Sequence, residues 1–320
     1  MRVSIRLWLM LATLVLCSGA AADSYPDRAI HMIVPFPPGG PASVVADVVG
    51  PQLGERLEQR VIVENRAGAD GIIGSEFVAK APPDGYTLLL ATSAQVIHPG
   101  TYISLPFDTE TAFAPVSLLL TSQYLLVVNP SLPVDSVEEL IAYAKTHPGK
   151  LVYASGGLGG PTHLAFELFK ITAGINLANV SYEGGGAALL GVVTGEAQVM
   201  LAPILAAIPM VEDGRLRALA VSGRHHAPAA PQLPTIAETL PGFSAVSWYR
   251  VLAPEGTPAA VIKRLNTELD RIVHEPETKK RFADIGGEAV GGPPSTFASL
   301  IHEEIPRWKR VAKEAGIRIE

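Results

Sequence analysis

The chain has 320 residues, with 25 lysines and arginines against 31 aspartates and glutamates. This length favours two domains over one. The net charge of −6 argues against a nucleic-acid-binding protein, and there is no polybasic run that would favour an anionic membrane surface.

Residues 1–22 have the three parts of a bacterial export signal. Arg2 and Arg6 form a basic start, the run LWLMLATLVL is apolar, and Ala20 to Ala22 form a small-residue cleavage site. The apolar run is too short to favour a membrane-spanning helix. We therefore predict a cleaved signal peptide, a mature chain that begins near Asp23, and a periplasmic location.

The single cysteine, Cys17, lies inside this signal. It is either an ordinary residue of the apolar run or a lipidated cysteine, and the bulky Leu16 before it argues against lipidation. A mature chain without cysteine owes none of its stability to disulfides.

Short apolar runs alternate along the mature chain with longer segments of helical spacing. In chain order they predict a strand at 29–36, a helix at 41–57, a strand within 60–71, a helix at 72–85, strands at 86–93 and 113–131, a helix at 136–150, a strand at 151–157, a helix at 161–174, a strand within 178–186, a helix at 187–196, a strand at 197–203, a helix at 204–214, a strand at 216–223, and amphipathic helices at 259–276, 277–286 and 295–316. This alternation predicts an α/β fold of mostly parallel sheets with helices on both faces.

The segment 113–131 is long for a single strand, and we expect it to cross between two domains. The segment 219–235 is rich in proline, alanine and serine, which suits a return crossing. The second domain is therefore predicted to be an insertion at 126–223, and the first to combine 23–125 with 224–320.

Several predicted strands end in glycine, serine or threonine, among them the strand that ends at Thr92 and Ser93. In open α/β sheets ligands bind beyond the carboxyl ends of the strands. These loops therefore predict one shared crevice.

The loop PFPPGGPAS, residues 35–43, lies between a predicted strand and a predicted helix. Its prolines fix the backbone, and Gly39 and Gly40 permit conformations that other residues resist. Ser43 is placed to cap the helix. Such a turn aims backbone N–H groups at a helix N-terminus, where they attract a carboxylate or phosphate without a charged side chain. The alternative is a plain strand-to-helix connector.

The loop SGGLGGPTH, residues 155–163, has the same design. Pro161 favours the first helical turn, in which Thr162 and His163 are placed to face the crevice. A histidine at such a place is either a ligand contact or plain structure. The glycine-rich YEGGG at 182–186 offers a third turn of this kind.

Several catalytic and cofactor motifs are missing from the sequence. No GxGxxG, GxSxG or HExxH occurs, and no cysteine is available to a zinc site. His225 and His226 lie in a Pro/Ala-rich segment that reads as a solvated loop. We therefore expect no cofactor, no metal and no enzymatic activity.

Ordered blocks across the whole mature chain resemble one family. They are YPDRAIHMIVPFPPGG, VIVENRAGADGIIGSEFVAKAPPDGYTLLLATS, FAPVSLL, HPGKLVYASGGLGGPTHLAFELFK, GRLRALAVSG, LPTIAE and WYRVLAPEGTP. Together they resemble the extracytoplasmic solute receptors of tripartite tricarboxylate transporters, the Bug-type binding proteins. The resemblance implies a two-lobed, type II-like periplasmic binding protein whose lobes close like a flytrap on a ligand in the cleft between them.

The resemblance also implies the ligand class and the site. Known ligands of the family are mainly small carboxylates: di- and tricarboxylates, aromatic acids, amino acids and nicotinate-type acids. The carboxylate grip is assigned to the two proline- and glycine-rich loops, with ordered waters bridging part of the contact. The ligand-binding candidates are Phe36, Pro37, Gly40, Ala42, Ser43, Ser93, Ser155, Gly159, Thr162, His163 and Tyr182.

The sequence departs from the family pattern at two places. Thr-Asp commonly follows the GGP of the first loop, whereas here Ala42 and Ser43 follow it. An Asp commonly ends the strand that matches QVMLAP, whereas here Ala202 and Pro203 stand there. Since that Asp receives an amino group or a hydroxyl, its absence makes an amino-acid ligand a weaker expectation than a plainer acid.

The leading hypothesis is a monomeric periplasmic receptor that hands a small organic acid to membrane permease subunits. A receptor that instead signals the presence of its ligand to a regulatory protein is the first alternative. The second is an exported hydrolase that uses Ser155 and His163, although this pair lacks a recognisable orienting carboxylate.

Overall fold

The computed structural model describes residues 25–320, so the predicted export signal and Cys17 lie outside the described residues. The strands are β1 (Ile30–Val34), β2 (Val61–Asn65), β3 (Thr87–Thr92), β4 (Phe113–Val128), β5 (Val152–Ser155), β6 (Ala178–Ser181), β7 (Val199–Pro203), β8 (Arg217–Val221), β9 (Val246–Pro254) and β10 (Gly287–Ala289). The helices are α2 (Pro41–Leu57), η1 (Ala69–Gly71), α3 (Ile72–Ala79), α4 (Ala94–Thr101), α5 (Val137–Thr146), α6 (Pro161–Ala173), α7 (Gly185–Val193), α8 (Ile204–Glu212), α9 (Ile236–Thr239), α10 (Ala259–His274), α11 (Pro276–Asp284) and α12 (Pro294–Glu314).

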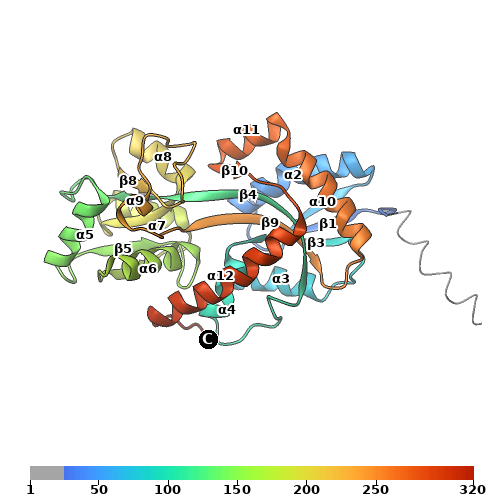
Figure 1. The fold of residues 1–320 in the computed structure, drawn as a ribbon, viewed down its shortest axis with the longest axis horizontal. Coiled ribbons are helices and arrows are strands. Elements are labelled where there is room, and N and C mark those ends of the chain that lie inside the picture. The colour runs from blue at the N-terminus through green and yellow to red at the C-terminus, as the bar shows by residue number, and fades with distance from the viewer. Residues whose placement is uncertain (1–24) are drawn as a thin grey trace, which may run out of the picture.

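The strands form two sheets that are joined through β4 into one ten-stranded array and lie in two lobes (Figure 1). In the first lobe the order is β2-β1-β3-β9-β4, with β10 on the far side of β4. In the second lobe β4 lies between β8 and β7, and β5 and β6 follow β7. The pairs β1/β2, β1/β3, β5/β6 and β5/β7 are parallel, as the alternation of strands and helices predicts.

Strand β4 is shared between the sheets. Its first part, up to Gln123, pairs antiparallel with β9, and its second part, from Tyr124, pairs with β7 and β8. The segment expected to cross between domains, 113–131, contains this strand. The strand therefore changes its pairing partners between Gln123 and Tyr124.

The chain returns to the first lobe at the start of β9. Ala245 N donates to the carbonyl of Ser222, and Val246 is the first β9 residue to pair with Gln123. The preceding residues belong to the second lobe, where the ring of Phe243 meets that of Phe169 edge to face. The segment 219–235, expected to form the return crossing, therefore lies on the second lobe, ahead of β9.

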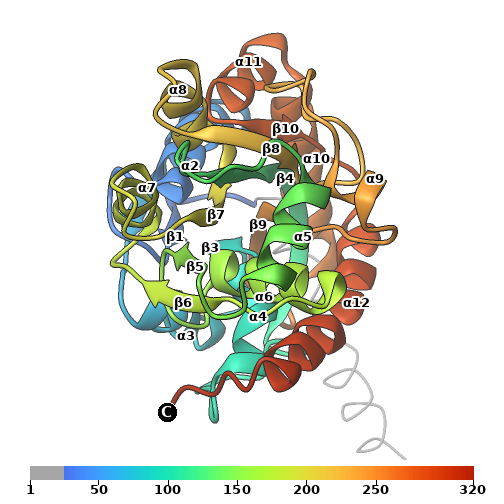
Figure 2. The ribbon, with the colours of Figure 1, turned by 90° about the vertical axis from the view of Figure 1, so that its left-hand side faces the viewer.

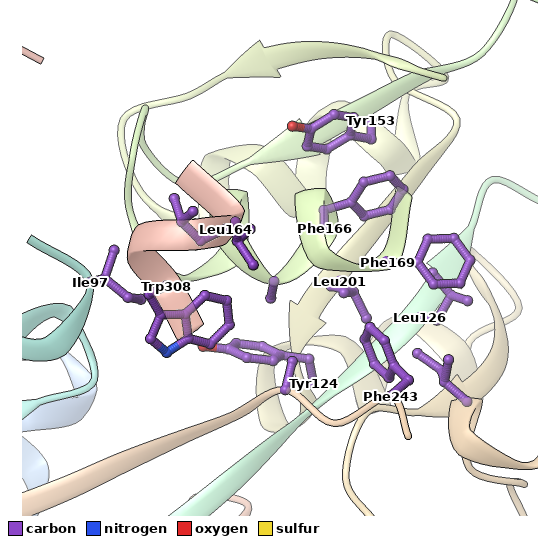
Figure 3. Packing of buried hydrophobic residues seen from close by; sticks show 14 of the residues in the cluster. Ile97, Tyr124, Leu126, Tyr153, Leu164, Phe166, Phe169, Leu201, Phe243 and Trp308 are labelled. Atoms are coloured by element: carbon purple, nitrogen blue, oxygen red, sulfur yellow. The ribbon is translucent and has the colours of Figure 1, made fainter. Parts of the chain in front are cut away.

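Helix α12 runs along one side of the molecule and touches both lobes (Figure 1). It packs against α4 of the first lobe and α6 of the second. Figure 3 shows the result: Trp308 of α12 lies beside Ile97 of α4 and Leu164 of α6, in one buried cluster that continues to Phe166, Phe169 and Phe243. The lobes thus share an apolar core on the α12 side.

Two smaller cores lie on other faces of the sheets. One packs α2 and α10 against the first sheet, and the other packs α7 and α8 against the second. The amphipathic patterns at 259–276 and 295–316 correspond to α10 and α12, whose apolar stripes are buried. Within residues 25–320, no helix combines the length and hydropathy that a bilayer crossing requires.

Candidate functional site

A cleft of about 750 Å³ lies between the two lobes. This volume is in the range of small-molecule sites. Figure 2 looks along the molecule from the second lobe, with α7 and α2 on one side and α12 on the other. The lining residues are 36–42, Asp70, 92–94, 122–124, Ser247 and Tyr249, with 156–158, 160–162, Gly184, Gly185 and Pro203 from the second lobe.

The two proline- and glycine-rich loops enter this cleft from opposite lobes and have the same backbone conformation. Gly39 and Gly159 are left-handed, with φ of 79° and 72°. The next residues, Gly40 and Gly160, are extended N-caps with φ of −77° and −80°. A proline then opens each helix, α2 and α6. The first glycine is required because other residues resist a positive φ, and the proline presets the helical turn.

Both helices begin without a side-chain cap. The first bonds within the helices are Val44 N to Gly40 O in α2 and Leu164 N to Gly160 O in α6. The preceding N–H groups of each helix therefore have no partner inside the helix. These groups and the helix dipoles form two facing sites for negative charge.

A third helix, α7, also begins at the cleft. Its N-cap, Gly184, has φ of 99°, and Gly185 lines the cleft beside it. No lysine, arginine or histidine is among the described residues that line the cleft, and Asp70 is the one charged side chain there. The attraction for an anion must therefore come from backbone N–H groups, as the acidic composition of the chain suggested.

The first loop is held from behind by Ser43. Its hydroxyl donates to the carbonyl of Pro37 at 3.2 Å and accepts from the side-chain amide of Asn65 at 2.6 Å. Asn65 also donates to the carbonyl of Phe36. Ser43 is itself buried and does not line the cleft. The serine thus fixes the loop, while the neighbouring Ala42 presents its N–H group.

The second loop is held by the first turn of its own helix. Thr162 Oγ1 accepts from Gly156 N at 3.0 Å, and His163 Nδ1 accepts from Gly159 N at 2.8 Å. The proton of the imidazole is therefore on Nε2, which lies 3.8 Å from the Glu167 carboxylate. Burial lowers the pKa of His163, although Glu167 opposes this effect. His163 is thus a neutral structural acceptor behind the loop.

Three further sequence candidates also lie behind the cleft. Ser155 is fully buried and exchanges hydrogen bonds with the side chain of Asn179. Gly159 faces the C-terminal segment, since a methyl group on it would overlap Ile319. The ring of Tyr182 lies under α7, where a methyl group on Gly191 would overlap it.

The structure therefore divides the sequence candidates into two groups. Those that line the cleft are Phe36, Pro37, Gly40, Ala42, Ser93 and Thr162. Those that do not line it are Ser43 and His163, which hold the two loops, and Ser155, Gly159 and Tyr182, which lie behind the cleft. The pair Ser155 and His163, considered for a hydrolase, lies outside the lining, and the only nitrogen of His163 free to act as a base already accepts from Gly159.

The cleft has a floor that joins the sequence candidate Ser93 to residues of β4 and β9 that sequence reasoning missed. The hydroxyls of Ser93 and Ser247 lie 3.2 Å apart, beside Tyr124 and Tyr249. Burial raises the pKa of Tyr249 to about 12, with a hydrogen bond to Ser247 acting in the opposite direction. The floor therefore offers neutral hydroxyls to a ligand. One sequence signal could have found it: in SWYR, Ser247 and Tyr249 alternate with two buried residues.

A metal site is not supported by the described residues. No group of three histidine, cysteine, aspartate or glutamate side chains occurs within residues 25–320 that could hold an ion. The chemistry available in the cleft is instead hydrogen bonding to an anion at the helix N-termini and to polar groups at the hydroxyl floor.

Two α/β lobes, a cleft between them and strands that pass from one to the other define the class: this is the fold of a periplasmic binding protein. A family model described as tripartite tricarboxylate transporter family receptor matches residues 45–317. The chain belongs to this family. The predicted fold class and the resemblance are therefore both confirmed.

Individual relatives cover nearly the whole chain. Protein BugT of Bordetella pertussis is 36% identical over 315 residues, which are 98% of this chain and 97% of BugT. Rhodopseudomonas palustris Rpa4515, solved with adipate, has a TM-score of 0.82 and 35% identity, covering 92% of this chain and all of that one. MatC from R. palustris, solved with bound malate, has a TM-score of 0.78 and 29% identity, covering 90% of this chain and 99% of that one.

Proposed function

We propose that this protein is a periplasmic receptor that captures a small organic carboxylate between its lobes and delivers it to a tripartite tricarboxylate-type permease. The observation that supports this most is the matched pair of loops at Gly39–Gly40 and Gly159–Gly160. Each presents an uncapped helix N-terminus to the same cleft from a different lobe. A carboxylate between them would receive hydrogen bonds from both.

Because the two loops belong to different lobes, a ligand bound by both would draw the lobes together. A ligand that contacts both lobes favours the closed state by its differential affinity for that state. We place the bending points beside Gln123 and Ala245, where β4 changes partners and the chain enters β9. The lobes would then comprise 25–123 with 246–320, and 124–245.

Gln123 is suited to guide such bending. Its side-chain oxygen accepts from Gly223 N at 2.8 Å, and its side-chain nitrogen donates to the carbonyl of His225 at 3.1 Å. Both partners belong to the loop after β8. The shorter bonds of the side chain therefore go to the second lobe, with a longer contact of 3.5 Å from its nitrogen to the Glu288 carboxylate of β10 in the first lobe. Gln123 also lines the cleft.

The relatives solved with adipate and malate support a carboxylate as the ligand. The cleft itself supports a ligand with limited negative charge, since no basic side chain lines it. Delivery to a permease is proposed from the family. A signalling role would use the same cleft and the same closure, so partner identification is needed to choose between the two.

The test is a thermal unfolding screen of the mature protein against mono-, di-, tri- and aromatic carboxylates. A bound acid should raise the melting temperature by mass action, by an amount that grows with ligand concentration. Calorimetry would then give the affinity of each hit. A broad acid panel without any shift would contradict the proposal.

A further inference from the structure

Asp70 differs from every other residue that lines the cleft. It is the one charged side chain there, and it lies in the short helix η1 with a left-handed backbone, φ 51° and ψ 32°. Ala69 before it is also left-handed, with φ of 46°. Such conformations are rare outside glycine and occur often at ligand clamps, held by the surrounding structure.

The position of Asp70 is fixed between the two loops that face each other across the cleft. On one side its neighbour Gly71 packs on the first loop, since a methyl group on Gly71 would lie 3.2 Å from Cζ of Phe36. On the other side a methyl group on Gly160 would lie 4.0 Å from Oδ2 of Asp70. The carboxylate is therefore beside the N-cap of α6, where a bound acid would also lie.

His98 orients this carboxylate. The side chain of His98, on α4, is 5% exposed, and its Nε2 lies 3.1 Å from Oδ2 of Asp70. Since an ionised carboxylate only accepts, Nε2 donates. The other oxygen, Oδ1, has no hydrogen bond from residues 25–320, and 37% of the Asp70 side chain is exposed. One carboxylate oxygen is thus free to accept a hydrogen bond from a ligand.

We infer that Asp70 determines specificity, and that the ligand is an acid with a hydroxyl or ammonium group beside its carboxylate. This inference rests on the proposed function. The helix N-termini would hold the carboxylate, and Oδ1 of Asp70 would accept from the adjacent donor. A ligand without that donor would leave the charge of Asp70 close to its own carboxylate, which disfavours binding.

This changes the expectation drawn from Ala202 and Pro203. The family resemblance placed a donor-accepting Asp at the end of β7, in the second lobe, and the chain lacks it. Asp70 brings a carboxylate into the same cleft from the first lobe. Hydroxy acids and amino acids are therefore expected ligands, although the β7 Asp is absent.

The experiment compares matched acids by calorimetry with the mature protein. Three series serve as probes: succinate, malate and aspartate; adipate, 2-hydroxyadipate and 2-aminoadipate; phenylacetate, mandelate and phenylglycine. In the series that binds, the hydroxy or amino member should bind at least about tenfold more tightly than the unsubstituted acid, as expected for a charge-assisted hydrogen bond. Comparison of the two substituted members then separates a hydroxyl from an ammonium donor.

Two variants assign the preference to Asp70. Asp70→Asn keeps the shape and removes the charge, and Asp70→Gly removes the side chain while suiting the left-handed backbone. Both should reduce the preference to within about twofold. Asp47→Asn, at an exposed position on α2, is the control and should leave the preference unchanged. Melting temperatures without ligand would show that each variant is folded.

The outcomes separate this inference from the proposed function. If the unsubstituted acids bind as tightly as their derivatives, or if the folded Asp70 variants keep the preference, Asp70 does not determine specificity although the receptor function stands. If none of the nine acids binds the wild-type protein, this inference fails, whereas the proposed function fails only when the broad carboxylate panel also gives no shift in melting temperature.

Discussion

The backbone amide of Gly159 donates to Nδ1 of His163 across 2.8 Å, so the second cleft loop is held by a neutral histidine four residues further along the chain. Because an imidazolium has no acceptor nitrogen, protonation of His163 would break this bond. The bond that holds the second loop therefore depends on the protonation state of His163.

From this coupling we predict an acid-sensitive stability. Burial lowers the pKa of His163 in the folded state, so the unfolded chain binds its proton first. The contribution of His163 to the free energy of unfolding should be complete above about pH 6.5 and should decline as the pH falls below that value. Urea unfolding across this range measures it.

Two substitutions separate His163 from the other titrating groups. His163→Asn retains an acceptor for Gly159 N but cannot titrate, so its acid-side decline should be shallower than that of the wild type. His163→Ala leaves the amide without a partner and should cost about 1–3 kcal/mol of stability. An unchanged decline in His163→Asn would contradict the prediction.

Gly40→Val and Gly160→Val should each lower ligand affinity at least tenfold, since one lost charge-assisted hydrogen bond costs about 1.5–3 kcal/mol. Both positions have ordinary negative φ, and a methyl group there would approach protein atoms no closer than 3.6 and 3.4 Å. The fold should therefore persist. Ala259→Val, on an exposed position at the start of α10 and outside the cleft lining, is the control. Calorimetry with unchanged affinity for either loop variant would remove that loop from the site.

Ile319 should support the second loop without touching the ligand. Its backbone pairs with Tyr102, and its side chain fills the space under Gly159. Ile319→Ala should lower stability by about 1 kcal/mol and weaken ligand binding, whereas Arg318→Ala, exposed beside it, should do neither. A double-mutant cycle sharpens the test: Gly159→Ala should cost less in the Ile319→Ala background, because the overlap is gone. Additive costs would show that the two residues do not interact.

We predict that Arg250 lowers the free energy of unfolding. It is buried on the face of β9 opposite the cleft, its guanidinium lies over the ring of Trp248, and its nitrogens lack hydrogen-bond partners among residues 25–320. Burial lowers its pKa to about 9, although Glu304 favours the charged form. Arg250→Met should therefore raise the free energy of unfolding by about 1 kcal/mol. Urea unfolding with Arg224→Met as an exposed control measures this, and a loss of stability would mean that the guanidinium is satisfied.

Much of the fold could be predicted from local patterns. The alternation of apolar runs and helical segments gave β1, α2, β3, α6 and α12 within a few residues, because propensity, capping prolines and glycines agree there. Helix α4 was missed, since its segment contains Pro99 and reads as a loop. Strand β9 was missed too, because its place between β3 and β4 depends on pairing with segments more than a hundred residues away.

Some residues of the candidate site could likewise be predicted from local sequence, and others could not. The loop residues of the cleft, such as Gly40 and Thr162, were predictable because glycine and proline specify their own backbone. The alternation in SWYR indicates that Ser247 and Tyr249 share one face of a strand, but only the tertiary fold brings that face to the cleft floor. Asp70 could not be singled out either. Nothing in its local sequence shows that the carboxylate lies beside a helix cap ninety residues further along the chain.

Helix α12 packs against both lobes along one side of the molecule. This packing affects the side from which a solute reaches the cleft. With that side bound together by Trp308 and its neighbours, the lobes can separate freely only on the opposite side. We therefore expect a solute to enter and leave past α2 and α7, which border that side in Figure 2.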